Sequence, residues 1–211
     1  MGGRRKQYLE LDGVPILLRS LRPFLDREDV VEVVVALPPD DVETPPQWLR
    51  AADPRIRVVA GGETRAASVR AALNVLSEVT RVVAVHDGAR PLIDAETVER
   101  CVRTARDGEG AVAGCPAVDT MKEVDEEARV VATPDRSRLW HAHTPQVFPR
   151  KLIVEAYAEA DPGELEATDD ASLVERRGEP LRMIRCTPRN IKVTRPADLA
   201  VARALLEEEP A

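Results

Sequence analysis

The chain has 211 residues, of which 44% are hydrophobic and only 3% are aromatic, and its net charge is −7. This length suits a single domain, 1–211, with an aliphatic core. The negative charge argues against a general nucleic-acid-binding protein. No apolar run approaches the ~18 residues of a membrane-spanning helix. Three widely spaced cysteines favour reduced thiols. We therefore expect a cytoplasmic protein without membrane contact.

Strand-like and helix-like patterns alternate along most of the chain. An amphipathic helix is expected to begin at Pro15. Short apolar runs predict buried strands of a mostly parallel sheet, and they lie at 29–37, 56–60, 82–85 and 111–118. Helical patterns lie at 66–76, 94–102 and 151–160. This alternation predicts an α/β fold.

Two of the predicted strands end in residues suited to ligand binding. Asp87 and Arg90 follow the 82–85 strand, and ligands of open α/β sheets bind beyond the carboxyl ends of strands. A plain Asp-Gly turn with a surface arginine is the alternative. Gly61 and Gly62 stand between a strand and a helix, where the backbone can approach a ligand closely. The alternative interpretation of this pair is an ordinary strand-to-helix turn that binds no ligand.

The pattern changes after residue 118. The segments 119–124 and 128–133 predict a β-hairpin, which is only marginally stable in isolation. We expect it to pack on the body or on another subunit. His141 and His143 share one face of the next extended segment, but a zinc site lacks a third ligand at a suitable spacing. Thr168 could bind a ligand or simply cap the following helix.

Only four of the 30 basic residues are lysines, and two of these, Lys6 and Lys192, have neighbours that suggest function. A compact ammonium group cannot always be replaced by a planar guanidinium. A further short strand is predicted at 190–193, around Lys192.

Seven motifs in a fixed order extend over nearly the whole chain. They are Lys6-Gln7-Tyr8, Gly61-Gly62 with Arg65 and Ser68-Val69, His86-Asp87-Gly88-Ala89-Arg90-Pro91, Asp119-Thr120-Met121-Lys122, Asp135-Arg136 with Leu139-Trp140-His141 and Thr144-Pro145-Gln146, Thr168-Asp169-Asp170-Ala171-Ser172, and Asn190-Ile191-Lys192-Val193-Thr194-Arg195-Pro196. With them the chain resembles the 2-C-methyl-D-erythritol 4-phosphate cytidylyltransferases. Relatives that use ribitol 5-phosphate share several motifs, and a non-catalytic nucleotide-binding homologue is a further alternative.

The resemblance implies a Rossmann-like nucleotidyltransferase fold. Such a fold has three layers, α/β/α, with a mostly parallel sheet and a protruding β-hairpin arm, here at about 118–136. It also implies a homodimer in which the arms are exchanged between subunits.

The implied reaction is attack of a polyol phosphate on the α-phosphorus of CTP, with pyrophosphate as the leaving group. This reaction belongs to isoprenoid precursor biosynthesis. Catalysis of such a transfer depends mainly on positioning the two substrates and on cations that neutralise the phosphate charge. The implied catalytic residues are Lys6, Lys192 and Arg136. The expected substrate-binding residues are Gly61, Gly62, Ser68, Asp87, Arg90, Thr120, Thr144 and Thr168. No metal ligand from the protein is expected, because Mg²⁺ would be held mainly by the CTP phosphates.

The start of the sequence departs from the family pattern. Members of the family begin with a buried strand and a glycine-rich phosphate loop, and this sequence opens just after them. We expect upstream codons to encode both. Loss of that central strand would leave unpaired strand edges inside the sheet. A chain without the phosphate loop should have weak activity or none.

Overall fold

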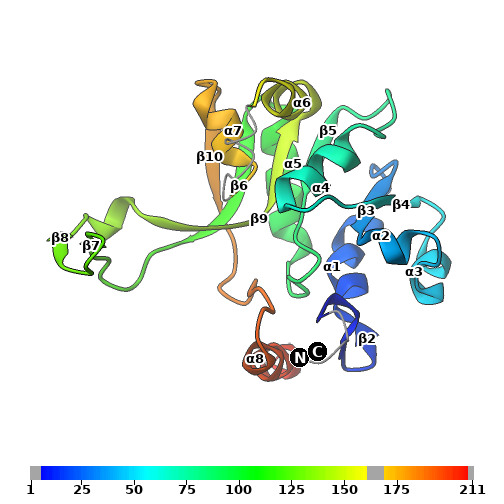
Figure 1. Cartoon of the computed structure of the whole chain (residues 1–211), viewed down its shortest axis with the longest axis horizontal. Coiled ribbons are helices and arrows are strands. Elements are labelled where there is room, and N and C mark those ends of the chain that lie inside the picture. Colours follow the sequence, from blue (N-terminus) through cyan, green and yellow to red (C-terminus); the bar gives the residue numbers. More distant parts are fainter. Residues whose placement is uncertain (1–5, 161–168, 209–211) are drawn as a thin grey trace.

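The computed structural model describes residues 6–160 and 169–208, with Lys6 described by its backbone alone. Helices cover two faces of a central sheet (Figure 1). The helices are α1 (Ile16–Leu25), α2 (Pro39–Val42), α3 (Gln47–Ala52), α4 (Arg65–Leu73), α5 (Ala95–Arg106), α6 (Arg150–Glu159), α7 (Ala171–Arg176) and α8 (Pro196–Glu207), with short 3-10 turns η1 (Lys6–Tyr8) and η2 (Arg136–Arg138).

The strands form one four-stranded sheet and three two-stranded pairs. They are β1 (Glu10–Leu11), β2 (Val14–Pro15), β3 (Val33–Leu37), β4 (Ile56–Ala60), β5 (Val82–Val85), β6 (Gly110–Pro116), β7 (Glu123–Val124), β8 (Val130–Ala132), β9 (Trp140–Pro149) and β10 (Leu181–Arg185). The four-stranded sheet has the order β10-β6-β9-β5.

Alternate residues of β6 point to different cores, and this alternation produces the three layers. Ala111 and Ala113 join the cluster with α5, whereas Val112 joins the cluster with α4, α6 and α7. Side chains of successive strand residues point to opposite faces, so a strand buried on both sides reads as a continuous apolar run. The predicted α/β/α class is confirmed.

The sheet is mixed because of one strand. β6 pairs in parallel with β10, and β3 pairs in parallel with β4. β9 runs antiparallel to both β5 and β6. The chain leaves the sheet along β6, forms the arm and returns along β9, so the returning strand runs opposite to β6.

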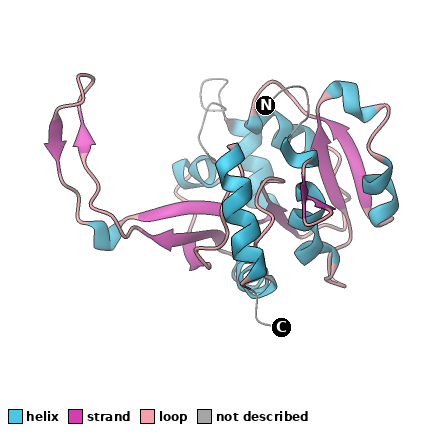
Figure 2. Ribbon diagram, turned by 90° about the horizontal axis from the view of Figure 1, so that it is seen from below, coloured by secondary structure: helices cyan, strands magenta, loops and turns pink. Residues whose placement is uncertain are grey.

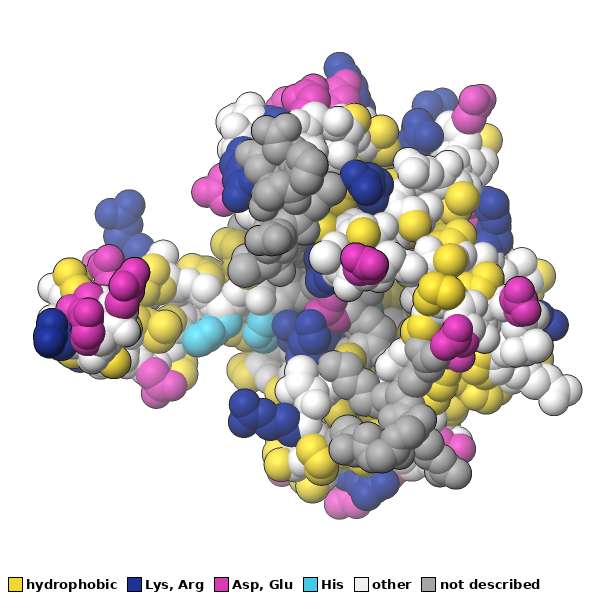
Figure 3. Space-filling view, in the orientation of Figure 1, with side chains coloured by type: hydrophobic (Ala, Val, Ile, Leu, Met, Phe, Trp, Pro, Cys, Tyr) yellow, Lys and Arg dark blue, Asp and Glu magenta, His cyan; other side chains and the backbone are white. Residues whose placement is uncertain are grey.

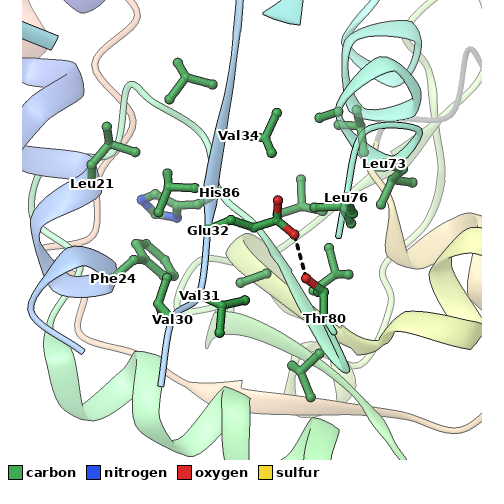
Figure 4. A pocket seen from close by; sticks show the side chains of 18 of the residues that line it. Leu21, Phe24, Val30, Val31, Glu32, Val34, Leu73, Leu76, Thr80 and His86 are labelled. Atoms are coloured by element: carbon green, nitrogen blue, oxygen red, sulfur yellow. Dashed lines mark hydrogen bonds between the residues drawn. The ribbon is translucent and has the colours of Figure 1, made fainter. Parts of the chain in front are cut away.

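β3 and β5 line a shared cavity of about 580 Å³. Within the described residues, β3 pairs only with β4 and β5 only with β9. Valine and leucine side chains are the commonest in the lining (Figure 4). Among its polar contacts, the Thr80 hydroxyl donates a hydrogen bond to Glu32 at 2.6 Å. Within the described residues, β3 and β5 therefore border an apolar cavity and do not pair with each other.

The hairpin stands away from the body as an arm (Figure 2). β7 and β8 pair antiparallel, as predicted. At the tip, Asp125 Oδ1 accepts hydrogen bonds from the backbone amides of Glu127 and Arg129. Apolar and charged side chains are mixed on its surface (Figure 3), and Val124, Val130 and Val131 are each more than half exposed.

Most other predicted elements are present, but several are shorter than expected. β3 begins at Val33, four residues later than expected, the hairpin strands β7 and β8 are shorter than the predicted 119–124 and 128–133, and no strand forms at 190–193. That segment crosses the loop after β5, where the Val193 amide donates to the Ala89 carbonyl at 2.8 Å. The 190–193 segment is held by individual hydrogen bonds and not by a β-ladder. None of the helices in the described ranges has the length and apolar character that crossing a membrane requires.

Candidate active site

The site is built around the loop that follows β5. Val85 ends the strand, and His86 and Asp87 turn the chain toward α1. A Cβ atom at Gly88 would lie 2.7 Å from Leu17 Cδ1, which is too close for a side chain. Gly88 therefore allows the loop to pack directly on α1, and this approach fixes the position of Asp87.

Three cationic side chains surround the Asp87 carboxylate. Lys192 Nζ lies 2.8 Å from Oδ2, Arg65 Nε lies 3.2 Å from Oδ1, and Arg90 Nε lies 3.7 Å from Oδ2. Burial alone would raise the pKa of Asp87, but the hydrogen bond from Lys192 and the charge of Arg65 lower it to about 2. Asp87 is therefore ionised at neutral pH.

His86 and Thr144 hold the backbone of Asp87. The Asp87 amide donates to Thr144 Oγ1 at 3.0 Å, and the same hydroxyl lies 3.1 Å from His86 Nδ1. His86 Nε2 lies 3.2 Å from the Arg90 carbonyl, which can only accept. Burial lowers the pKa of His86 to about 4, so its ring is neutral at pH 7. Nε2 then carries the proton, and Nδ1 accepts from Thr144.

Buried polar contacts attach the 190–196 segment to this loop. Arg90 Nη1 donates to the Asn190 carbonyl at 2.8 Å, and Asn190 Nδ2 donates to the Thr144 carbonyl at 2.9 Å. Arg90, Thr144 and Asn190 are each less than a tenth exposed. Arg90 thus reaches Asp87 from the interior, whereas Lys192 is 38% exposed and reaches it from the open side.

Arg65 joins the site to the start of α7. Its Nη2 donates to Asp170 Oδ2 at 2.7 Å, and the Tyr157 hydroxyl donates to Asp170 Oδ1 at 2.5 Å. Asp170 is fully buried. Gln146 lies close by, donating to Asp169 and accepting from the Ala171 amide, each at 2.8 Å. Arg65 is therefore shared between two carboxylates that lie on different segments.

The glycine pair forms a tight turn before α4. A Cβ atom at Gly62 would lie 2.5 Å from the Cβ of Ala67, so only glycine fits there. The Gly62 amide donates to Ser68 Oγ at 3.1 Å, and the Gly61 amide donates to the Leu37 carbonyl at 2.7 Å. Thr64 caps α4 through its side-chain oxygen. This turn lies at the amino end of the helix that carries Arg65.

The predicted site residues that the structure describes divide into three groups. Asp87, Arg90, Thr144 and Lys192 meet at the end of β5, and Gly61, Gly62 and Ser68 lie at the amino end of α4, which Arg65 begins. Thr120 and Arg136 lie on the arm, where Arg136 Nη1 donates to the Val118 carbonyl at 2.6 Å. Thr168 and the Lys6 side chain lie outside the described residues.

Several residues at the centre of the site were missing from the predicted set. Arg65 stood in a quoted motif, and its place at the start of the helix that follows Gly61-Gly62 was the available signal. Asp170, Asn190 and Gln146 also stood in motifs. Their burial, which makes their polar contacts decisive, could not be seen in the sequence.

An α/β/α fold with a cation-rich loop at the carboxyl end of a sheet strand suits a nucleotidyltransferase, whose substrates carry phosphates. A sequence profile of the 2-C-methyl-D-erythritol 4-phosphate cytidylyltransferase family matches residues 1–208. The chain belongs to this family.

Individual relatives agree with this assignment. The chain is 44% identical over 208 residues to the 2-C-methyl-D-erythritol 4-phosphate cytidylyltransferase of Symbiobacterium thermophilum, covering 99% of this chain and 87% of the relative. It is similar to the crystal structure of that enzyme from Thermus thermophilus, with a TM-score of 0.82 and 35% identity, covering 96% of this chain and 94% of the other. The 4-diphosphocytidyl-2C-methyl-D-erythritol synthase structure from Anaerococcus prevotii matches with a TM-score of 0.86 and 28% identity, covering 97% and 91%.

The ion pairs of Asp87 make stability depend on pH in a predictable direction. A carboxyl group whose pKa falls from 3.8 to about 2 on folding stabilises the protein above pH 4 and loses that contribution as the pH falls toward 2. We expect Asp87→Asn to lower the free energy of unfolding at pH 7 by on the order of 2 kcal/mol. The difference from wild type should shrink between pH 4 and pH 2, measured by urea unfolding. Asp125→Asn at the arm tip is the control, and a pH-independent difference for Asp87→Asn would contradict the ion-pair explanation.

Proposed function

We propose that this chain transfers the cytidylyl group of CTP to 2-C-methyl-D-erythritol 4-phosphate and releases pyrophosphate. The observation that carries the proposal is the Asp87 cluster, in which Lys192, Arg65 and Arg90 face one ionised carboxylate at the end of β5. Segments of five of the seven family motifs meet there through the contacts of Asp87, Thr144, Arg65 and Asn190. Family membership supports the same activity.

The cluster suits the demands of this reaction. A phosphate monoester has a second pKa of about 6, so the nucleophile is mostly ionised at neutral pH and needs no general base. What the site must supply is positive charge and alignment. We propose that Lys192 binds the polyol phosphate, since its ammonium is accessible from solvent, and that Asp87 accepts hydrogen bonds from the polyol hydroxyls.

Mg²⁺ is proposed to act through the nucleotide. Carboxylates are its preferred protein ligands, but the carboxylate of Asp87 already faces three cations and is poorly suited to holding a second metal charge. CTP phosphates are the remaining oxygen donors that the reaction supplies. When bound there, Mg²⁺ would neutralise charge on the triphosphate.

The arm is proposed to complete the site of a second subunit in a homodimer. It exposes Val118, Val124, Val130 and Val131 among charged side chains, and a protruding ribbon of this mixed character suits a partly polar interface with another chain. Arg136 lies at its root and contacts Val118 within its own chain. A two-fold dimer with exchanged arms would bring Arg136 and Thr120 to the partner's Asp87 cluster. The three free cysteines are consistent with the cytoplasmic location that we propose.

Lys192→Ala is expected to lower the rate of pyrophosphate release from CTP and methylerythritol phosphate by ~10²–10³, because it removes a cation that acts on the reacting phosphates. The melting temperature without ligand should fall only modestly, since Lys192 is partly exposed and Arg65 and Arg90 still face Asp87 in the variant. Lys192→Arg should restore little activity, because a guanidinium differs from an ammonium in shape and hydration.

Lys151→Ala is the matched control, since the Lys151 ammonium pairs with Glu155 at 3.9 Å on the outside of α6. The rise in melting temperature on adding CTP, Mg²⁺ and the polyol phosphate gives a second readout that requires binding but no turnover. Equal rises with ribitol 5-phosphate, or equal losses for the Lys151 and Lys192 variants, would count against the proposed substrate and the proposed role.

Arm exchange is tested by mixing two defective protomers, Arg136→Ala and Lys192→Ala. Each mixed dimer would hold one site with both residues intact, so random exchange of equal amounts should restore roughly a quarter of wild-type activity. Absence of recovery, with subunit exchange demonstrated by mass spectrometry, would mean that Arg136 acts within its own chain or not at all.

A further inference from the structure

Two cysteines and a histidine from three strands converge where the arm joins the body. Cys115 lies near the end of β6, Cys186 directly follows β10, and His143 lies on β9. Cys115 Sγ lies 3.7 Å from Cys186 Sγ, and Cys186 Sγ lies 3.5 Å from His143 Nδ1. All three donor atoms lie within 4.8 Å of one another. In Figure 3, histidine side chains appear at this root of the arm, beside basic side chains.

Sheet register produces this convergence. β6 and β10 pair in parallel with Gly114 opposite Arg185, so the next residues along the two strands are Cys115 and Cys186. Across the antiparallel ladder, Cys115 is opposite His141, and His143 lies two residues further along β9 on the same face. The sequence showed two histidines without a third ligand, because the cysteines are 71 residues apart in the chain.

The distances match those of a tetrahedral zinc centre. Zn²⁺ binds thiolate sulfur at about 2.3 Å and imidazole nitrogen at about 2.0–2.1 Å, so tetrahedral angles place two sulfurs about 3.8 Å apart and a sulfur and a nitrogen about 3.6 Å apart. The observed separations of 3.7 and 3.5 Å fall within about 0.1 Å of these values. Rotation of one side chain can adjust the third distance, which separates Cys115 Sγ from His143 Nδ1.

We propose that Cys115, Cys186 and His143 bind one Zn²⁺ ion through two thiolates and an imidazole, with the fourth position open to water. Two thiolates balance the charge of a divalent ion, so the nearby Arg90 guanidinium faces a neutral centre. Soft sulfur and borderline nitrogen donors select zinc over Mg²⁺. The ion would tie together β6, which enters the arm, β9, which leaves it, and β10.

Metal binding at this site must displace the thiol protons. Burial and the neighbouring Cys115 raise the pKa of the Cys186 thiol to about 11, and burial lowers the pKa of His143 to about 4. Without metal, the Cys115 thiol can donate to the Cys186 carbonyl at 3.3 Å. Binding would therefore release protons from the thiols, while the imidazole is already neutral, and affinity should rise with pH. Cys115 and His143 are half-buried, so an ion can reach them from solvent.

Cobalt substitution tests the site directly. The reduced full-length protein, titrated with Co²⁺ under anaerobic conditions, should develop a thiolate-to-cobalt charge-transfer band and the visible bands of a tetrahedral ion, saturating at one equivalent. Zn²⁺ should remove these bands at one equivalent, and Mg²⁺ should not. Cys186→Ser and His143→Gln should abolish the bands, whereas Cys101→Ser, a buried cysteine outside the group, should retain them.

Thiol labelling of the wild-type protein supplies a readout that no folding defect of a variant can mimic. Zn²⁺ should slow labelling of Cys115 and Cys186, located by mass spectrometry, and should raise the melting temperature. No charge-transfer band in wild type with three titratable thiols would overturn the proposal. So would an unchanged band in a Cys115→Ser, Cys186→Ser double variant, or the finding that the two cysteines form a disulfide in the isolated protein.

Discussion

The ion pairs around Asp87 and Asp170 hold together segments that are far apart in the chain. Arg65 and Asp170 are separated by 105 residues, and Lys192 pairs with Asp87 across the same length of sequence. A buried carboxylate without a partner would be strongly destabilising, so these loops must pack together for the core beneath them to close. The need to neutralise two acidic groups therefore fixes the positions of the cations that the proposed reaction requires.

The return of β9 into the sheet links this site to the arm. Its buried half carries Thr144 and Gln146, which position Asp87 and the start of α7. Its exposed half carries His141 and leads back from the arm. A force on the arm would therefore act on the same strand that supports the Asp87 loop. If the arm contacts a second subunit, dimer formation and site geometry are mechanically connected through β9.

Local pattern in the sequence was sufficient for the longer helices, most strands of the sheet and the hairpin. The valines of β5 and β6, the Asp94 cap of α5 and the change of period after residue 118 each depend on a few neighbouring residues. The same information predicted Asp87 and Lys192, because each stands in a motif with its own local signature. The ion pair between them was not predicted and is seen only in the structure.

Contacts that depend on register or burial could not be foreseen. Arg65 lies between two carboxylates because α4 packs beside both loops, and nothing in its neighbours specifies this. Cys115 and Cys186 meet because two parallel strands pair in one register out of several. The 190–193 segment has the composition of a strand, yet buried side chains of Arg90 and Asn190 hold it in a loop instead.

We propose that the Asp87 cluster binds the polyol phosphate. A crystal structure with methylerythritol phosphate and a non-reactive CTP analogue tests this directly. We expect the substrate phosphate against the Lys192 ammonium, and polyol hydroxyls within hydrogen-bond distance of the Asp87 carboxylate. A sugar phosphate bound elsewhere, with the 2.8 Å contact between Lys192 and Asp87 unchanged, would contradict it.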